Sequence, residues 1–207
     1  MELVDILDEA GEKTYTFASR DEAHLKALWH RNVGLLLIYP HLDEEYLIFS
    51  ERSLIKKSFP GKIDLAASGH LSKGESPEDG CREFVEELGS TSLLEGLQYL
   101  SDFKLINSYL LGDDTYHNRE FLSLYLKKVH SLNIFTLEKT EIARFIAIKV
   151  ADLAKLRSGE SVPSYECTPV LHFLKNVSLH DFIPSESEYI ENILDKIITT
   201  PLTELTY

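Results

Sequence analysis

One short segment of the chain contains both the start and the stop signal of a helix. Ser76 is a suitable capping residue, Pro77 suits the first helical position, and two acids follow in the first turn, where the helix dipole favours them. Gly89 suits the left-handed residue that ends many helices. The segment therefore predicts a helix over Pro77–Leu88.

The predicted helix carries acidic and apolar side chains on different faces. With about 3.6 residues per turn, Glu83, Glu86 and Glu87 project to one side. The apolar side chains that fall largely on the other side are Cys81, Phe84, Val85 and Leu88. Neighbouring carboxylates repel one another, a cost that a bound divalent cation would reverse, and oxygen ligands favour Mg²⁺ or Mn²⁺ over zinc. A merely solvated acidic surface is the alternative reading.

The rest of the chain reads as strands with a few helices. Apolar alternation predicts a hairpin with its turn near Gly11, and Ser19 can cap a short helix after it. The other predicted strands are Val33–Tyr39, Tyr46–Phe49, Leu97–Tyr109, Phe121–Val129 and Ala143–Val150, and the other predicted helices are Ala151–Arg157 and Tyr189–Thr199. This mixture favours an α/β or α+β sandwich, and 207 residues suit one domain with a terminal extension.

Charge and hydropathy exclude several classes of partner. The chain has 34 acidic residues against 21 Lys plus Arg, a formal charge of −13, so its field repels nucleic acid. The longest nearly apolar run, Val33–Tyr39, is too short to cross a bilayer, and the first residues lack a secretory signal. We therefore expect a cytoplasmic protein in which Cys81 and Cys167 are reduced.

The acidic face belongs to a longer motif. Gly69-His-Leu-Ser-Lys-Gly-Glu75 is followed by Arg82-Glu-Phe-Val-Glu-Glu-Leu-Gly89. Together they resemble the Nudix box, G-x5-E-x7-R-E-U-x-E-E-x-G-U with U apolar. Two positions depart from it: six residues instead of seven separate Glu75 from Arg82, and Ser90 stands where an apolar residue is usual. One missing residue rotates the first helical turn by about 100° relative to the rest.

Further segments resemble the Nudix branch close to isopentenyl-diphosphate isomerases. Among them are Trp29-His30-Arg31, Pro60-Gly61-Lys62-Ile63-Asp64 and Asn118-Arg119-Glu120-Phe121. The resemblance covers roughly residues 1–170 and implies an α/β fold, a Nudix-type α/β/α sandwich with a mixed central sheet. We expect residues 171–207 to be a C-terminal helical extension packed on the same domain.

The Nudix resemblance implies a metal site on the predicted helix. Glu83, Glu86 and Glu87 would bind Mg²⁺, with Mn²⁺ as the alternative, and the Gly69 carbonyl would assist. Arg82 would hold a box glutamate by an ion pair.

Catalytic and substrate-binding roles follow from the same resemblance. Glu87 and Glu83 are the catalytic candidates within the box, and Glu120 is the candidate for an additional acid from outside it. Arg52 and Lys56 could approach a diphosphate, because guanidinium and ammonium groups favour phosphate oxygens. All three residues outside the box could equally be surface residues.

Three histidines, His24, His30 and His70, match positions near those that bind metal in the isomerases. A lone histidine is, however, more often a hydrogen-bonded structural residue.

Three functions are compatible with this sequence. The first is metal-assisted hydrolysis of a nucleoside diphosphate derivative or a related small-molecule diphosphate. The second is isomerisation of isopentenyl diphosphate, for which the resemblance implies a cysteine where the chain has Ala66-Ala67-Ser68. A hydroxyl transfers protons less readily than a thiol near neutral pH. The third is a catalytically silent diphosphate-binding module. We expect a small-molecule partner, no nucleic acid or membrane, and leave a homodimer open.

Overall fold

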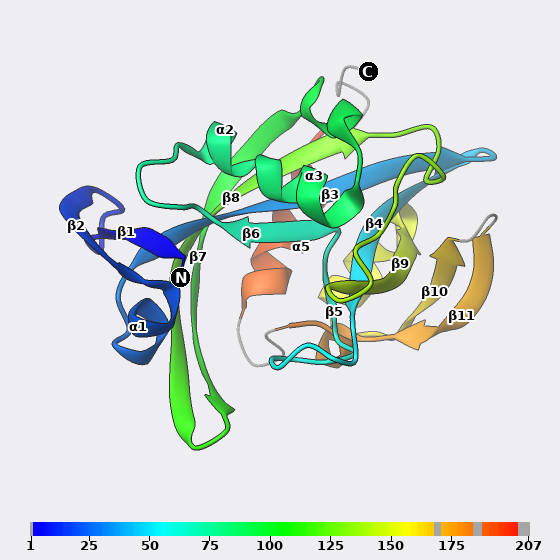
Figure 1. The fold of residues 1–207 in the computed structure, drawn as a ribbon. Helices are drawn as coiled ribbons and strands as arrows, with labels where there is room; N and C mark the ends of the chain where they lie inside the picture. Colours follow the sequence, from blue (N-terminus) through cyan, green and yellow to red (C-terminus); the bar gives the residue numbers. More distant parts are fainter. Residues whose placement is uncertain (1, 168–170, 184–187, 203–207) are drawn as a thin grey trace.

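The computed structural model describes residues 2–167, 171–183 and 188–202. Its centre is a nine-stranded mixed sheet with the strand order β11-β10-β9-β4-β3-β8-β7, in which β5 also pairs with β4 and β6 with β3 (Figure 1). The strands of this sheet are β3 (His30–His41), β4 (Glu44–Arg52), β5 (Ile63–Leu65), β6 (Ala67–His70), β7 (Gln98–Leu111), β8 (Asp114–Lys128), β9 (Ile142–Lys149), β10 (Val162–Cys167) and β11 (Leu171–Val177). β3 and β8 run parallel, and the other described pairs are antiparallel.

Shorter elements surround the sheet. A separate hairpin consists of β1 (Leu3–Leu7) and β2 (Lys13–Ser19). The helices are α1 (Arg20–Leu25), α2 (Pro77–Gly80), α3 (Arg82–Leu88), α4 (Leu153–Arg157) and α5 (Tyr189–Thr199), with 3-10 turns at η1 (Thr91–Leu94), η2 (Val150–Asp152) and η3 (Leu179–Asp181). The predicted hairpin, the Ser19 cap of α1 and the range of α5 are confirmed. None of the described helices is long and apolar enough to span a membrane.

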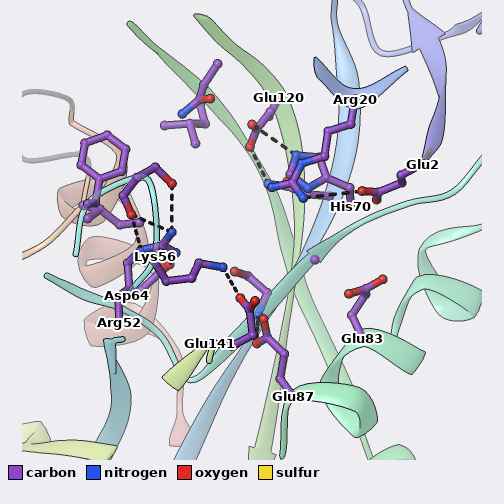
Figure 2. Close-up of a pocket in the computed structure, with 18 of the residues that line it drawn as sticks. Glu2, Arg20, Arg52, Lys56, Asp64, His70, Glu83, Glu87, Glu120 and Glu141 are labelled. Carbon is purple, nitrogen blue, oxygen red and sulfur yellow. Dashed lines mark hydrogen bonds and ion pairs between the residues drawn. The ribbon is translucent and has the colours of Figure 1, made fainter. Parts of the chain in front are cut away.

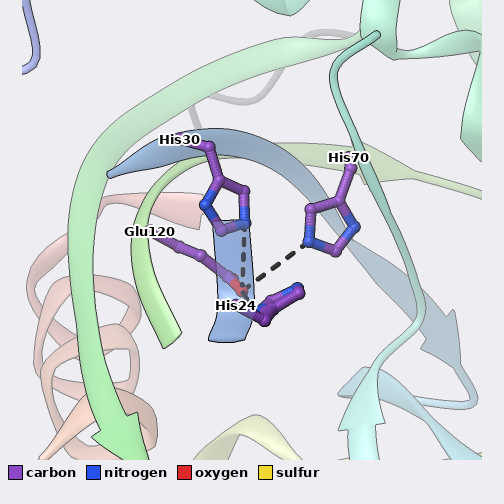
Figure 3. A group of neighbouring side chains, drawn as sticks. All are labelled: His24, His30, His70 and Glu120. Atoms are coloured by element: carbon purple, nitrogen blue, oxygen red, sulfur yellow. Dashed lines mark ion pairs between the residues drawn. The ribbon is translucent and has the colours of Figure 1, made fainter. Parts of the chain in front are cut away.

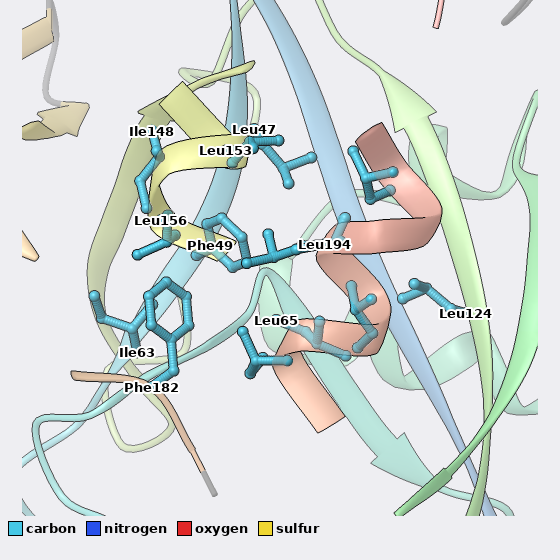
Figure 4. Close-up of a cluster of buried hydrophobic side chains, with 14 of the residues drawn as sticks. Leu47, Phe49, Ile63, Leu65, Leu124, Ile148, Leu153, Leu156, Phe182 and Leu194 are labelled. Carbon is cyan, nitrogen blue, oxygen red and sulfur yellow. The ribbon is translucent and has the colours of Figure 1, made fainter. Parts of the chain in front are cut away.

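Helices cover both faces of the sheet. On one face, α3 buries Phe84 and Leu88 completely in a cluster with side chains of β3 and β4. On the other face, α4 and α5 pack in a second cluster, where Leu194 and Leu156 lie near Phe49 (Figure 4). The predicted α/β sandwich with a mixed central sheet is therefore confirmed. Val85, which was expected to pack with Phe84 and Leu88, is only half-buried.

The predicted continuous helix over Pro77–Leu88 is divided into α2 and α3. Cys81 separates them, because its amide bonds to the Glu78 carbonyl and its own carbonyl accepts from the Phe84 amide, both at 3.2 Å and at a spacing of three residues. These tighter turns interrupt the α-helical ladder. The two ends agree with the prediction: Ser76 forms a capping box with Asp79, and Gly89 is left-handed with a φ of 67°.

The C-terminal region is less helical than expected. Residues 171–177 form β11, which pairs with β10 at the edge of the sheet, and among the described residues of the region only Tyr189–Thr199 is an α-helix. Neither of these two strands was predicted, because the segments 162–167 and 171–177 alternate weakly and carry Pro163, Glu166 and Lys175. The last five residues of the region, 203–207, lie outside the described residues.

Candidate active site

A cavity of about 770 Å³ opens between α3, the loop after β4 and the β7–β8 hairpin. Figure 2 shows acidic and basic side chains converging on it from several elements. Every site residue predicted from the sequence lines this cavity: Arg52, Lys56, Gly69, Arg82, Glu83, Glu86, Glu87 and Glu120. Arg52 and Glu120, which are 68 positions apart in the chain, thus line the same cavity.

The acids of α3 occupy different environments within the cavity. A Glu87 carboxylate oxygen accepts a hydrogen bond of 3.1 Å from the backbone amide of Ser68 on β6. Glu83 lies against Gly69 of the same strand, where even a methyl group would overlap the Glu83 side chain. Glu86 is the outermost acid, with 62% of its side chain exposed. Glu83 and Glu87 are therefore the two acids that α3 holds against the sheet.

Arg82, the first residue of α3, bonds both to the preceding loop and to acids of the helix itself. Its Nε donates to Glu75 at 2.7 Å and one terminal nitrogen donates to Ser72 at 3.0 Å, while the other terminal nitrogen bonds to Glu83 and Glu86. The Glu75 carboxylate also accepts from the Ser72 amide at 2.7 Å, and its pKa is lowered chiefly by Arg82. The shortened box therefore still places Glu75 on Arg82, since the break at Cys81 lets the loop and α3 adjust separately.

Burial disfavours the charged form of both inner carboxylates. Burial raises the pKa of Glu83, although Arg82 opposes the shift. It raises the pKa of Glu87 to about 8, with Asp64 and Glu141 adding repulsion and the Ser68 amide opposing it. A divalent cation would restore the charged form of both groups.

This shift predicts how stability depends on pH without a divalent metal. Below its ordinary pKa of 4.5, Glu87 is protonated in both the folded and the unfolded protein, so it does not reduce the free energy of unfolding at low pH. Between pH 4.5 and about 8 the unfolded chain releases a proton that the folded chain retains, so stability falls as pH rises, at up to ~1.4 kcal/mol per pH unit. Urea unfolding in a chelator should show this slope, and Glu87→Gln should lack it. Equal slopes in the two proteins would contradict the buried carboxylate.

Two cations face α3 across the cavity, and each is paired with an acid. Arg52 donates to Asp64 at 2.9 Å and to the Ser58 carbonyl, and Lys56 bonds to Glu141 (Figure 2). Asp64 is only 7% exposed. No role was predicted for Asp64 or Glu141 from the sequence. Glu141 gave no local signal, because it belongs to a loop between β8 and β9 and meets Lys56 only through the fold.

A second group of ligand atoms lies deeper, where three histidines surround Glu120. One ligand atom from each of His24, His30, His70 and Glu120 lies within 4.8 Å of the others (Figure 3). His30 and His70 each place Nε2 3.7 Å from the same Glu120 oxygen, and Asn32 donates to the second oxygen at 2.5 Å. Glu120, predicted as an acid that assists the box, is thus surrounded by histidines.

Burial favours the neutral form of two of these histidines, His30 and His70. Burial lowers the pKa of His30 to about 4 and the pKa of His70 well below its ordinary value. The Nδ1–H of His30 donates to the Leu28 carbonyl at 2.9 Å, which leaves Nε2 facing Glu120. Neither Nε2 atom has a hydrogen-bond partner among the described residues. Three imidazoles and one carboxylate suit a transition-metal ion such as Mn²⁺, Fe²⁺ or Zn²⁺ better than Mg²⁺.

The cavity as a whole is too acidic to attract an anion without help. Among its described lining residues, eight acids and four cations leave a formal excess of four negative charges, with histidines counted as neutral. A diphosphate would be repelled at this excess unless divalent cations neutralised part of it. The carboxylates of α3 are placed where they could hold such cations, an arrangement that suits a protein acting on phosphates.

Comparison with known proteins gives the family. The model of the NUDIX domain matches residues 28–167. An uncharacterized Nudix hydrolase of Clostridium acetobutylicum is 30% identical over 155 residues, which are 74% of this chain and 73% of that protein. Nudix hydrolase 3 of Arabidopsis thaliana is 30% identical over 165 residues, 78% of this chain but only 21% of that much longer protein. This chain belongs to the Nudix hydrolase family.

The fold agrees with a solved structure. DR0079 from Deinococcus radiodurans is 22% identical, with a TM-score of 0.57 over 77% of this chain and 91% of that one. The family match begins at residue 28 and ends at residue 167, so five lining residues complete the cavity from outside it: Glu2, Arg20, His24, Ile183 and Tyr189.

Proposed function

We propose that this chain hydrolyses the diphosphate linkage of a nucleoside diphosphate derivative or a related small molecule, with Mg²⁺ as its cofactor and Mn²⁺ as an alternative. One observation carries the proposal: Glu83 and Glu87 of α3 face the cations Arg52 and Lys56 across a single cavity. Acids that hold a divalent cation and cations that hold phosphate oxygens are the two components that diphosphate hydrolysis requires.

The donor atoms fit a hard divalent cation. Glu83 and Glu87 offer carboxylate oxygens, and both have raised pKa values that a cation would lower again. Glu86 and the Gly69 carbonyl complete the proposed ligand set. Bound there, the cation would neutralise diphosphate charge and lower the pKa of a coordinated water molecule.

The protein's own groups orient the substrate. Arg52 and Lys56 would exchange part of their contacts with Asp64 and Glu141 for phosphate oxygens. Release of Lys56 leaves Glu141 as an acid that can accept a proton within the same cavity, alongside Glu87 and Glu120 as candidate bases. Arg82 keeps Glu83 in position through an ion pair.

Isopentenyl-diphosphate isomerisation is the alternative, and the histidine group around Glu120 is the observation that favours it. Allylic isomerisation needs a proton delivered to one carbon and another proton removed. Ser68, the residue before Gly69, supplies a hydroxyl where a thiol is expected. Hydrolysis needs no such pair at carbon, so it remains our proposal.

A phosphate-release screen with Mg²⁺, Mn²⁺ or Zn²⁺ tests the proposal. The substrates are nucleoside di- and triphosphates, nucleotide sugars, dinucleotides and prenyl diphosphates. We expect metal-dependent hydrolysis of at least one of these diphosphates and no conversion of isotopically labelled isopentenyl diphosphate to dimethylallyl diphosphate. Isomerisation without hydrolysis would reverse the assignment, and inactivity on all substrates would favour a silent binding module.

A further inference from the structure

Two residues of the C-terminal segment, Ile183 and Tyr189, line the cavity that holds the carboxylates of α3. Both follow residue 167, where the family match ends. The part of the cavity wall that they form is therefore an addition to the matched domain.

The first of these residues is fixed beside β5, which pairs with the strand that holds Arg52. The Ile183 amide donates to the Ile63 carbonyl at 3.0 Å. Phe182, only 1% exposed, packs edge-to-face on Phe49 with the ring centroids 5.1 Å apart. Because Asp64 follows Ile63 and bonds to Arg52, Ile183 is anchored next to the cations that face the diphosphate.

The second residue begins α5, which is itself anchored in the core. Four apolar side chains of this helix are at most 3% exposed: Ile190, Ile193, Leu194 and Ile197. Figure 4 shows Leu194 of this helix among the side chains of that cluster. Tyr189 is 6% exposed, and it shares the cavity wall with Leu105 of β7. A ring held in this way gives a rigid surface instead of a mobile loop.

This end of the cavity differs chemically from the end beside α3. Its wall combines the apolar side chains of Ile183 and Leu105 with the rings of Tyr189, Tyr109 and Phe59, the last two with centroids 4.7 Å apart. Burial, with Asp64 and Glu120 adding negative charge, raises the pKa of Tyr189 well above its ordinary value. The Tyr189 hydroxyl is therefore neutral, and the nearby acids oppose any anion placed here.

We infer that Ile183 and Tyr189 are specificity-determining residues that contact the organic group joined to the diphosphate, and that this group is uncharged and largely apolar at the end they contact. The inference rests on the proposed function, because α3 and the cations fix which end of the substrate carries phosphate. A second phosphate or a carboxylate at the Tyr189 end would meet the negative charge of Asp64 and Glu120 that acts on the Tyr189 hydroxyl.

Binding of non-hydrolysable analogues tests this inference without relying on turnover. The probes are methylenediphosphonate monoesters that carry a methyl, a hexyl or a 5-carboxypentyl group, titrated by calorimetry into the full chain with Mg²⁺. We expect the hexyl analogue to bind at least about tenfold more tightly than either of the others, because it alone covers the apolar wall. Ile183→Ala should reduce this preference at least about fivefold, mainly through weaker binding of the hexyl analogue.

Ile198→Ala is the matched control, since Ile198 lies on α5 with 42% exposure and outside the cavity. It should leave the preference unchanged. Equal affinity of the wild type for hexyl and methyl analogues, or equal effects of the two alanine variants, would overturn the inference alone. Failure of every analogue to bind with Mg²⁺ would overturn it together with the proposed function.

Discussion

Glu87→Gln is expected to lower the kcat for the best diphosphate substrate by about 10³-fold, a barrier increase of ~4 kcal/mol. The amide keeps the shape of the side chain and can still accept from the Ser68 amide, but it removes the buried charge that the metal requires. The fold should remain intact, because no core atom is lost. Phosphate release at pH 8 with Mg²⁺ measures the effect, and the thermal midpoint checks the fold.

Glu78→Gln provides the matched control for this substitution. Glu78 lies on α2, is exposed and does not line the cavity, so its loss should change kcat less than twofold, on the order of experimental error for a surface site. If Glu87→Gln keeps its kcat within about tenfold of the wild type, a barrier change of ~1.4 kcal/mol, Glu87 is not part of the catalytic site.

The sequence predicts the elements whose signals are local. The cap at Ser76, the stop at Gly89 and the apolar spacing of α5 each depend on residues within a few positions, and the structure agrees with all three. The break at Cys81 was not predicted, because the helix signals on both sides of it are continuous. It consists of two hydrogen bonds at a spacing of three residues on either side of Cys81, and no capping or stop residue in the sequence marks that position.

The assembly of the site depends on contacts that no local pattern encodes. His24 comes from α1, His30 from β3, His70 from β6 and Glu120 from β8, and they meet because β3 pairs in parallel with β8 and antiparallel with β6. The register places His30 beside Glu120 and Asn32 beside His70. The resemblance singled out the three histidines and Glu120 separately, and the strand pairing shows that Glu120 lies among the histidines.

The same reasoning explains why Glu141 and Tyr189 were not predicted as site residues. Glu141 reaches the cavity because its loop bonds to the end of α3, with the Glu138 amide donating to the Glu87 carbonyl at 2.9 Å. Tyr189 reaches it because α5 packs on the face of the sheet opposite α3. A resemblance limited to roughly residues 1–170 contains no information on that helix.

Gly69→Ala is expected to lower kcat/KM for hydrolysis by about 100-fold, ~2.7 kcal/mol, while the thermal midpoint changes little. Gly69 does not have a positive φ, so its backbone accepts a side chain. The obstacle is Glu83, whose Cγ, Cδ and Oε2 occupy the space that a Cβ at position 69 would need. The carboxylate must therefore move away from β6, and the geometry of the proposed metal site changes even though every proposed ligand is still present.

A second variant separates this steric effect from other consequences of altering β6. Ser68→Ala, one residue earlier on the same strand, should retain hydrolysis within about tenfold, because its backbone amide still donates to Glu87 and its hydroxyl has no role in the proposed reaction. Binding of Mn²⁺, measured by electron paramagnetic resonance, should be weakened in Gly69→Ala and unchanged in Ser68→Ala. Normal hydrolysis by Gly69→Ala would mean that Glu83 does not need its position against β6, and would exclude it from the catalytic site.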